Sequence, residues 1–185
     1  IQMLGYSAPQ QLHAAIAAIR SHFEQAYDLG CGTGLMGEVL RPHVDHLSGC
    51  DLSRAMLQEA RAKQIYDRLD GDDVVHALTQ QHAASLDLIT AADVLVYIGA
   101  LTDVFLAAHH ALKIGGLFAF TTQACAGERF IIGEDLRSAH SERYLRTQAL
   151  QTGFEILAFE AVSVRQDGDQ AVRGWLCVLR NSADV

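Results

Sequence analysis

An aspartate and three closely spaced glycines are the residues of this chain whose types and spacing are best suited to chemistry. Asp28 is followed by Gly30, Gly32 and Gly34, between a short apolar run and a helix-like pattern. Glycines let bare backbone approach a ligand, and a strand–turn–helix context of this kind is typical of nucleotide-type cofactor sites. A dinucleotide motif needs its last glycine where this chain has Leu35, and an acid before the turn suits an ammonium group better than a pyrophosphate. The pattern therefore predicts a cofactor other than a dinucleotide.

A second acid follows at the distance expected for a ribose contact. Residues 47–50 predict a strand, and Asp51 ends it about 20 residues after the glycines. An acid in this position can accept hydrogen bonds from both ribose hydroxyls. Ser53 is expected to cap the following helix, so that Asp51 is left for the ligand.

These motifs, with others downstream, resemble those of the class I S-adenosylmethionine-dependent methyltransferases. Residues 28–34 match an acidic residue followed by x-G-x-G-x-G, and residues 51–57 resemble D-x-S-x-x-M-L. Residues 87–95 resemble the family's fourth strand and the motif after it. Residues 112–118 resemble L-x-P-G-G-x-L, with Ile114 in place of the proline. The resemblance covers most of the chain and implies methyl transfer, with S-adenosyl-L-methionine as the cofactor.

The resemblance also implies which residues hold the cofactor. Asp73 stands where the family keeps an acid near the adenine amino group, and Asp72 beside it is an alternative. Leu52 and Met56 are expected beside the adenosine, although core packing explains both equally well. The full set of expected cofactor-binding residues is Asp28, Gly30, Cys31, Gly32, Gly34, Asp51, Leu52, Met56, Asp73 and Ala92.

A narrower resemblance is to predicted methyltransferases that are often fused behind tetratricopeptide repeats. It rests on residues 4–9, 92–97 and 139–145. This resemblance implies an upstream tetratricopeptide repeat region in the full-length protein. Because the chain begins at Ile1 rather than Met, it is expected to be either an excised domain or a chain without its disordered start. Acceptors in this branch are largely unassigned, so the acceptor stays open.

The acceptor side carries the candidate catalytic residues. Methyl transfer at a sulfonium carbon mainly needs alignment and a dry site, and a base is needed only where the acceptor must lose a proton. Tyr97 follows the expected fourth strand, at the sheet edge where open α/β sheets bind ligands. Tyr97 and His140 are hypotheses for the catalytic residues, as pocket-lining groups more than as bases, whereas His109 and His110 are interpreted as surface or packing residues. The residues expected to line the acceptor pocket are Tyr6, Tyr97, Gln123, His140 and Tyr144.

The elements that must position these residues alternate between strand and helix. The pattern predicts a single α/β domain over residues 1–185 with a doubly wound, Rossmann-like methyltransferase fold. Its sheet is expected to be mostly parallel and seven-stranded, with one antiparallel strand near the edge and helices on both faces. Residues 68–73 predict a short third strand, residues 74–82 a helix or an irregular turn, and residues 167–168 a hairpin turn. Residues 123–144 lack periodicity, at least up to the helix expected at their end, and are expected to form a lid-like segment.

Composition restricts the partners and the compartment. The 185-residue chain has a net charge of −8, which argues against nucleic acid because phosphate contacts need a basic face. It has no apolar run long enough to span a membrane and nothing that resembles a signal peptide. We therefore expect no membrane partner. Its four cysteines show neither paired nor metal-ligand spacing, so we also expect no metal and a cytoplasmic location. The expected partner is a small-molecule, carrier-bound or protein acceptor.

Two other functions remain as alternatives. A nicotinamide-dependent oxidoreductase could use the same strand–turn–helix element, but Asp28, Leu35 and the absence of a Y-x-x-x-K pair argue against it. A non-catalytic S-adenosylmethionine-binding module is disfavoured because none of the cofactor motifs is broken.

Overall fold

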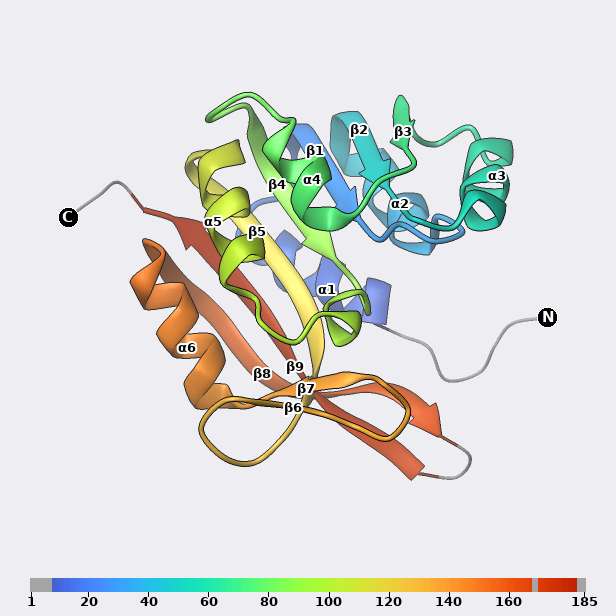
Figure 1. Ribbon diagram of the computed structural model, residues 1–185. Helices are drawn as coiled ribbons and strands as arrows, with labels where there is room; N and C mark the ends of the chain where they lie inside the picture. The colour runs from blue at the N-terminus through green and yellow to red at the C-terminus, as the bar shows by residue number, and fades with distance from the viewer. Residues whose placement is uncertain (1–7, 168–169, 183–185) are drawn as a thin grey trace.

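The computed structural model describes residues 8–167 and 170–182, in which strands and helices alternate around one sheet (Figure 1). The elements in chain order are α1 (Ala8–Ala17), β1 (Phe23–Leu29), α2 (Leu35–Leu40), the short 3-10 helix η1 (Arg41–His43), β2 (Val44–Cys50), α3 (Arg54–Ala62), β3 (Arg68–Asp70), α4 (Val74–Thr79), β4 (Leu86–Ala91), the 3-10 helix η2 (Leu95–Tyr97), α5 (Thr102–Ala111), β5 (Leu112–Ala124), β6 (Phe130–Ile132), β7 (Ser138–His140), α6 (Glu142–Gln151), β8 (Phe154–Asp167) and β9 (Gln170–Asn181).

The predicted doubly wound sheet is confirmed. Strands β3, β2, β1, β4 and β5 lie side by side in this order, and all of them are parallel. Strand β9 pairs antiparallel with β5, and β8 pairs antiparallel with β9, so these seven strands form a mostly parallel sheet with one antiparallel strand near its edge. The expected hairpin turn at residues 167–168 falls partly outside the described residues, but the two strands that it was to join do pair.

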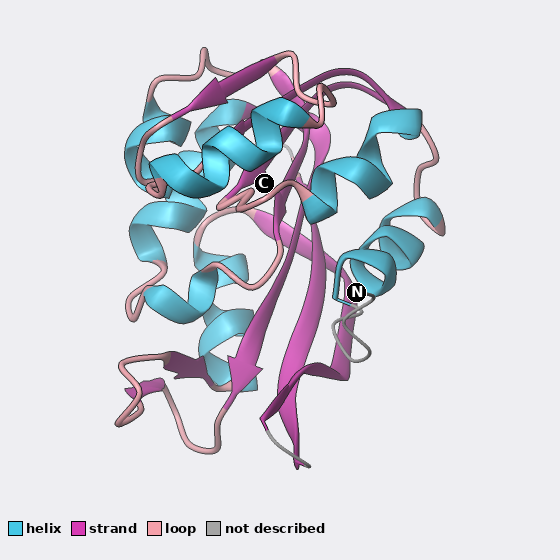
Figure 2. Cartoon of the chain, turned by 90° about the vertical axis from the view of Figure 1, so that its right-hand side faces the viewer, coloured by secondary structure: helices cyan, strands magenta, loops and turns pink. Residues whose placement is uncertain are grey.

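Helices cover both faces of the sheet, and each face has its own apolar core (Figure 2). Helices α4, α5 and α6 pack on one face, where Phe105 of α5 meets Phe118 and Phe120 of β5 edge-on at centroid distances of 5.6 and 5.7 Å. Helices α1 and α2 cover the other face through Leu12, Ile16 and other apolar residues. Strand β4 lies between β1 and β5 and is buried along its whole length, as expected for a strand covered on both faces.

The first part of the lid-like segment, residues 123–140, is more regular than its lack of periodicity indicated, which corrects the expectation from the sequence. It contains a short hairpin in which β6 pairs with β7, and β7 adds to the end of β5 through the pairs Gln123–Ala139 and Ala124–His140. Strands of three residues are too short to show a period in the sequence, so only backbone pairing with β5 reveals them. The hairpin lies at the carboxyl end of β5, at the lower end of the sheet in Figure 1.

Within the described residues, none of the helices has the length and apolar character needed to cross a membrane.

A substitution at Gly37 tests how tightly the glycine-rich side of β1 is packed. A Cβ at this position of α2 would overlap the hydroxyl and Cζ of Tyr66. Alanine normally stabilises a helix interior by about 1 kcal/mol relative to glycine. We expect Gly37→Ala instead to lower the free energy of unfolding by roughly 1–3 kcal/mol, because the buried ring has to move. Urea denaturation monitored by circular dichroism measures the change.

The control for this substitution is the same change in a Tyr66→Leu background. With the ring removed, Gly37→Ala should no longer lower stability, and the difference between the two backgrounds measures the overlap. A Gly37→Ala protein as stable as the native chain would contradict this account of the packing.

Candidate functional site

The turn between β1 and α2 brings backbone to the edge of the sheet. Gly30 and Gly32 have φ values of 59° and 54°, in the left-handed region that favours glycine. A Cβ on Gly30 would overlap the side chain of Val94, whereas a Cβ on Gly32 would meet nothing closer than the sulfur of Met56 at 3.8 Å. Gly30 therefore permits close packing beneath the turn, and the backbone of Gly32 faces open space above it.

Asp51 holds this turn against the end of β2. Its Oδ2 accepts a hydrogen bond from the Gly32 amide at 2.9 Å, and its Oδ1 accepts one from the Ser53 amide at 2.7 Å. The Ser53 hydroxyl in turn caps α3 by accepting from the Met56 amide, as expected. An ionised carboxylate has about four lone-pair positions, so about two of them stay available on Asp51 for a ligand.

Asp28 places a carboxylate directly beneath the turn. Only 1% of its surface is exposed, and its oxygens accept hydrogen bonds from the hydroxyls of Tyr66 at 2.6 Å and Thr90 at 2.9 Å. Burial raises the pKa of Asp28 to about 6 despite these two donors, with a smaller contribution from Asp51. Asp28 is therefore mostly ionised at neutral pH, as a negative charge that no cationic side chain neutralises in the described part of the chain.

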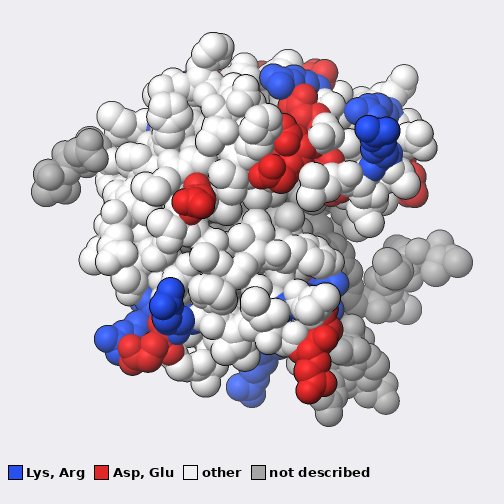
Figure 3. Space-filling view, in the orientation of Figure 1, with Lys and Arg blue, Asp and Glu red and all other residues white. Residues whose placement is uncertain are grey.

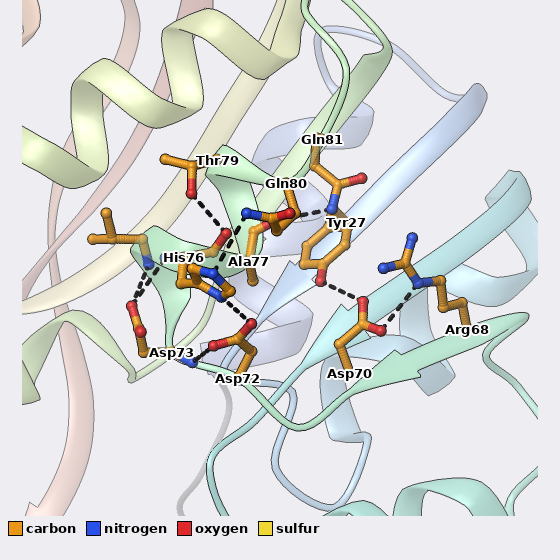
Figure 4. Close-up of polar contacts among 11 residues, drawn as sticks. Tyr27, Arg68, Asp70, Asp72, Asp73, His76, Ala77, Thr79, Gln80 and Gln81 are labelled. Carbon is orange, nitrogen blue, oxygen red and sulfur yellow. Dashed lines mark hydrogen bonds and ion pairs between the residues drawn. The ribbon is translucent and has the colours of Figure 1, made fainter.

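Two further acids begin α4, and Figure 4 shows how differently they are used. Asp73 caps the helix through Oδ1, which accepts from the amides of Val75 and His76, both at 3.0 Å. Asp72 binds the ring of His76 through Oδ2 and the amide of Asp73 through Oδ1. Among the described residues, Asp72 has both oxygens engaged while Asp73 keeps Oδ2 free. The neighbouring Asp70 turns away, toward the Tyr27 hydroxyl and Arg68.

These residues surround a cleft of about 850 Å³ at the carboxyl ends of the parallel strands. Its lining includes most of the expected site residues, namely Asp28, Gly30, Cys31, Gly32, Asp51, Leu52, Met56, Asp73, Ala92 and Tyr97. Gly34 does not line it; this residue is the N-cap of α2 and lies against Tyr66.

The electrostatic character of the cleft is strongly negative. It is lined by five aspartates, while no lysine or arginine is among the described residues that line it. Figure 3 shows acidic side chains gathered on this face of the molecule, beside α4. A cleft of this kind attracts a cationic ligand and repels a pyrophosphate. The five aspartates are Asp28, Asp51, Asp72, Asp73 and Asp93.

His140, expected on the acceptor side, is not brought into the cleft. It is fully buried, and its Nε2 lies 3.0 and 2.9 Å from the carbonyl oxygens of Ile98 and Gly99. Because carbonyls only accept, Nε2 carries the proton, and Nδ1 accepts from the Thr122 hydroxyl at 2.7 Å. Burial lowers the pKa of His140, so the neutral ring acts as a brace between β5, β7 and the segment after η2.

The other expected acceptor residues divide between the cleft and the core. Tyr97 lines the cleft with 63% of its surface exposed. Tyr144 is buried, and its hydroxyl accepts from the Leu101 amide at 2.8 Å. Gln123 lies near the end of β5 and is not among the lining residues. Tyr6 lies outside the described residues.

Two charged residues beside Tyr97 were not predicted as site residues from the sequence. Asp93 follows β4 with a φ of 58°, lines the cleft, and lies 4.0 Å from the guanidinium of Arg137. Arg137 comes from the turn between β6 and β7 and donates to the Tyr97 hydroxyl at 3.0 Å. A polar residue directly after a buried strand was the available signal for Asp93. Arg137 belongs to a group of arginines that are close in sequence, with Arg129, Arg143 and Arg146, but this grouping did not point to the cleft.

No cluster of three or more histidine, cysteine, aspartate or glutamate side chains that could hold a metal ion occurs among residues 8–167 and 170–182.

Comparisons with known proteins agree with this geometry. Residues 27–118, from β1 to β5, match the family model of a methyltransferase domain. The chain is 30% identical over 175 residues to a malonyl-[acyl-carrier protein] O-methyltransferase of Salmonella typhimurium, covering 91% of this chain and 62% of that protein. It is 32% identical over 113 residues to a ubiquinone biosynthesis O-methyltransferase of Nitrosococcus oceani, covering 60% of this chain and 46% of that protein. The chain therefore spans less than two thirds of the length of these relatives.

The fold is shared with solved structures of low sequence identity. One is the 1,6-didemethyltoxoflavin-N1-methyltransferase of Burkholderia thailandensis, determined with 1,6-didemethyltoxoflavin and S-adenosylhomocysteine bound. It superposes with a TM-score of 0.79 at 16% identity, covering 96% of this chain and 79% of that chain. The family match over residues 27–118, the strand order and the acidic glycine-turn cleft together indicate a methyltransferase domain with the fold that solved S-adenosylmethionine-dependent methyltransferases share.

Proposed function

We propose that the chain transfers the methyl group of S-adenosylmethionine to an oxygen atom of its acceptor. The observation that carries this proposal is the cleft beside the glycine turn, lined by five aspartates and, among the described residues, by no lysine or arginine. The two curated relatives described above are both named O-methyltransferases, which supports oxygen as the accepting atom.

Three of the five aspartates of the cleft fit different parts of the cofactor. Asp28 supplies negative charge beneath the turn for the ammonium group, Asp51 has lone pairs left for the ribose hydroxyls, and Asp73 has a free oxygen for the adenine amino group. When bound, the cofactor supplies an electrophilic methyl group on a positively charged sulfur. The chain's own part is to align that group with the acceptor and to keep the acceptor end of the cleft dry.

The segment over residues 123–144 is proposed to cover the acceptor side of this single domain. Support comes from the β6–β7 hairpin, whose Arg137 contacts Tyr97 at the cleft, and from Phe130, which packs against Gly99. The acceptor is proposed to be a small molecule, a carrier-bound group or a protein. An upstream repeat region and a cytoplasmic location stay predictions; the four cysteines, all unpaired in the structure, are compatible with a reducing compartment.

The nicotinamide alternative has weaker support from the cleft. A pyrophosphate at the glycine turn would lie beside Asp28 and Asp51 without an arginine or lysine to neutralise it. A non-catalytic binding module would share the whole cofactor site, so methyl transfer itself has to be measured to separate the two.

Replacing Asp51 with asparagine tests the cofactor site. We expect Asp51→Asn to weaken S-adenosylhomocysteine binding at least about tenfold, because a charge-assisted hydrogen bond contributes roughly 1.5–3 kcal/mol. Isothermal titration calorimetry measures the dissociation constant, and circular dichroism establishes that the variant is folded.

The matched control is Asp70→Asn at the end of the adjacent strand β3. Asp70 binds Tyr27 and Arg68 rather than lining the cleft, so its substitution should leave the affinity within about twofold, well below the loss of a charged hydrogen bond. Equal affinities for native and Asp51→Asn proteins would show that Asp51 only holds the turn. No measurable binding of either S-adenosylmethionine or S-adenosylhomocysteine to the native chain would refute the proposed function.

The pKa of Asp28 gives the site a defined pH dependence. A cationic ligand favours the ionised carboxylate, and the pKa of Asp28 in the free protein is raised to about 6. At pH 5 the Asp28 carboxyl is mostly protonated and must lose its proton when the ligand binds, whereas at pH 7.5 it is already ionised. The affinity for S-adenosylhomocysteine should therefore fall about tenfold from pH 7.5 to pH 5. The same raised pKa makes the contribution of Asp28 to the free energy of unfolding decrease as pH rises from 3.8 to about 6, with no further change above.

Calorimetry of the native chain, Asp28→Asn and His76→Gln at several pH values separates Asp28 from His76, whose pKa is raised by its hydrogen bond to Asp72. Asp28→Asn should bind weakly and with little pH dependence, while His76→Gln should retain the native slope. A native-like slope in Asp28→Asn would assign the titration to another group.

A further inference from the structure

Asp93 occupies an unusual backbone conformation at the acceptor end of the cleft. Its φ of 58° lies in the left-handed region, which side chains other than glycine adopt rarely and which concentrates at functional sites. The Asp93 amide donates to the Thr121 hydroxyl at 3.0 Å, so the turn is fixed to β5. This fixed turn places the side chain of Asp93 in the cleft lining, between Ala92 and Val94.

The polar atoms around Asp93 leave both a proton acceptor and a proton donor without a partner. Neither carboxylate oxygen of Asp93 accepts a hydrogen bond from any described residue, and its ion pair with Arg137 is loose at 4.0 Å. Arg137 donates instead to the Tyr97 hydroxyl, and its guanidinium lies 5.2 Å from the centre of that ring. Because the Tyr97 oxygen accepts this bond, its own proton remains free to donate.

The charges around Asp93 indicate which class of acceptor the site would favour. Arg137 and, at longer range, Arg165 are the cations near it, and Arg165 is itself paired with Asp135 at 3.3 Å. The remaining charged groups of the cleft lining are the four other aspartates. An acceptor carrying a carboxylate would be repelled by this field, whereas a neutral hydroxyl would not. Burial raises the pKa of Asp93, which makes its carboxylate a better proton acceptor than an exposed one.

We propose that Asp93 and Tyr97 form the acceptor subsite, and that this subsite takes a neutral hydroxyl of the phenol type that passes its proton to Asp93. The inference rests on the proposed function and adds the class of the acceptor. As the acceptor oxygen bonds to the methyl carbon, the carbon–sulfur bond breaks with its electron pair left on sulfur, and the hydroxyl proton moves to Asp93 and then to water. Phenols are acidic enough for a carboxylate to assist in this way, whereas simple alcohols hold their proton far more tightly.

A matched set of probes tests this subsite through binding alone. The probes are 4-methylphenol, its methyl ether 4-methylanisole, and 4-methylbenzoate, which share one ring and differ in the group offered to Asp93. Calorimetry with protein saturated by S-adenosylhomocysteine should show 4-methylphenol binding at least about tenfold more tightly than the ether, which lacks the proton, and than the carboxylate, which is repelled. Asp93→Asn should abolish most of this preference and leave S-adenosylhomocysteine affinity within about twofold.

The control variant is Asp135→Asn, an acid outside the cleft lining that accepts a hydrogen bond from the Arg137 amide at 3.1 Å. It should retain the preference for the phenol, whereas Asp93→Asn should not. Tighter binding of 4-methylbenzoate than of 4-methylphenol, no binding of the phenol, or an unchanged preference in Asp93→Asn would overturn the subsite. If the native chain does not bind S-adenosylhomocysteine at all, the proposed function itself is refuted, so the two failures are distinguishable.

Discussion

The buried carboxylate of Asp28 is the interaction on which the site depends. Its side chain is buried, and among the described residues the hydroxyls of Tyr66 and Thr90 are the groups that donate hydrogen bonds to it. These donors come from different parts of the chain, so the carboxylate is satisfied only when β1 and β4 are in register and the Tyr66 ring lies beneath the turn. The close approach of that ring to Gly37 and Gly49 shows how little freedom this arrangement leaves.

The acids at the two ends of the parallel strands have opposite electrostatic surroundings. Asp87 near the start of β4 is neutralised by Lys113 at 3.1 Å and lies 3.7 Å from Arg20. Asp28 and Asp51 at the other end have no cationic partner among the described residues. A buried charge without a cationic partner is costly, so the retention of Asp28 at the cleft is explained by a ligand that brings the positive charge.

The acceptor end is built by long-range contacts rather than by one local motif. His140 in β7 holds the backbone of Ile98 and Gly99 while accepting from Thr122 in β5. This neutral ring is a brace because both of its nitrogens are already bonded, so His140 is not available for proton transfer. The shape of the acceptor end therefore depends on the β6–β7 hairpin staying attached to β5.

The sequence by itself determined the strand–turn–helix units, the order of the motifs and many of the residues that line the cleft, because glycines, caps and apolar runs act over a few residues. Asp28, Gly32 and Asp51, which line the cleft, were predicted as site residues from residue type, spacing and the resemblance to a known family. The tertiary structure decided the rest: it moved His140 into the core, placed Arg137 beside Asp93, and formed the three-residue strands of the hairpin. These outcomes depend on backbone pairing between distant segments and on which polar atoms find partners after burial, and neither leaves a periodic trace in the sequence.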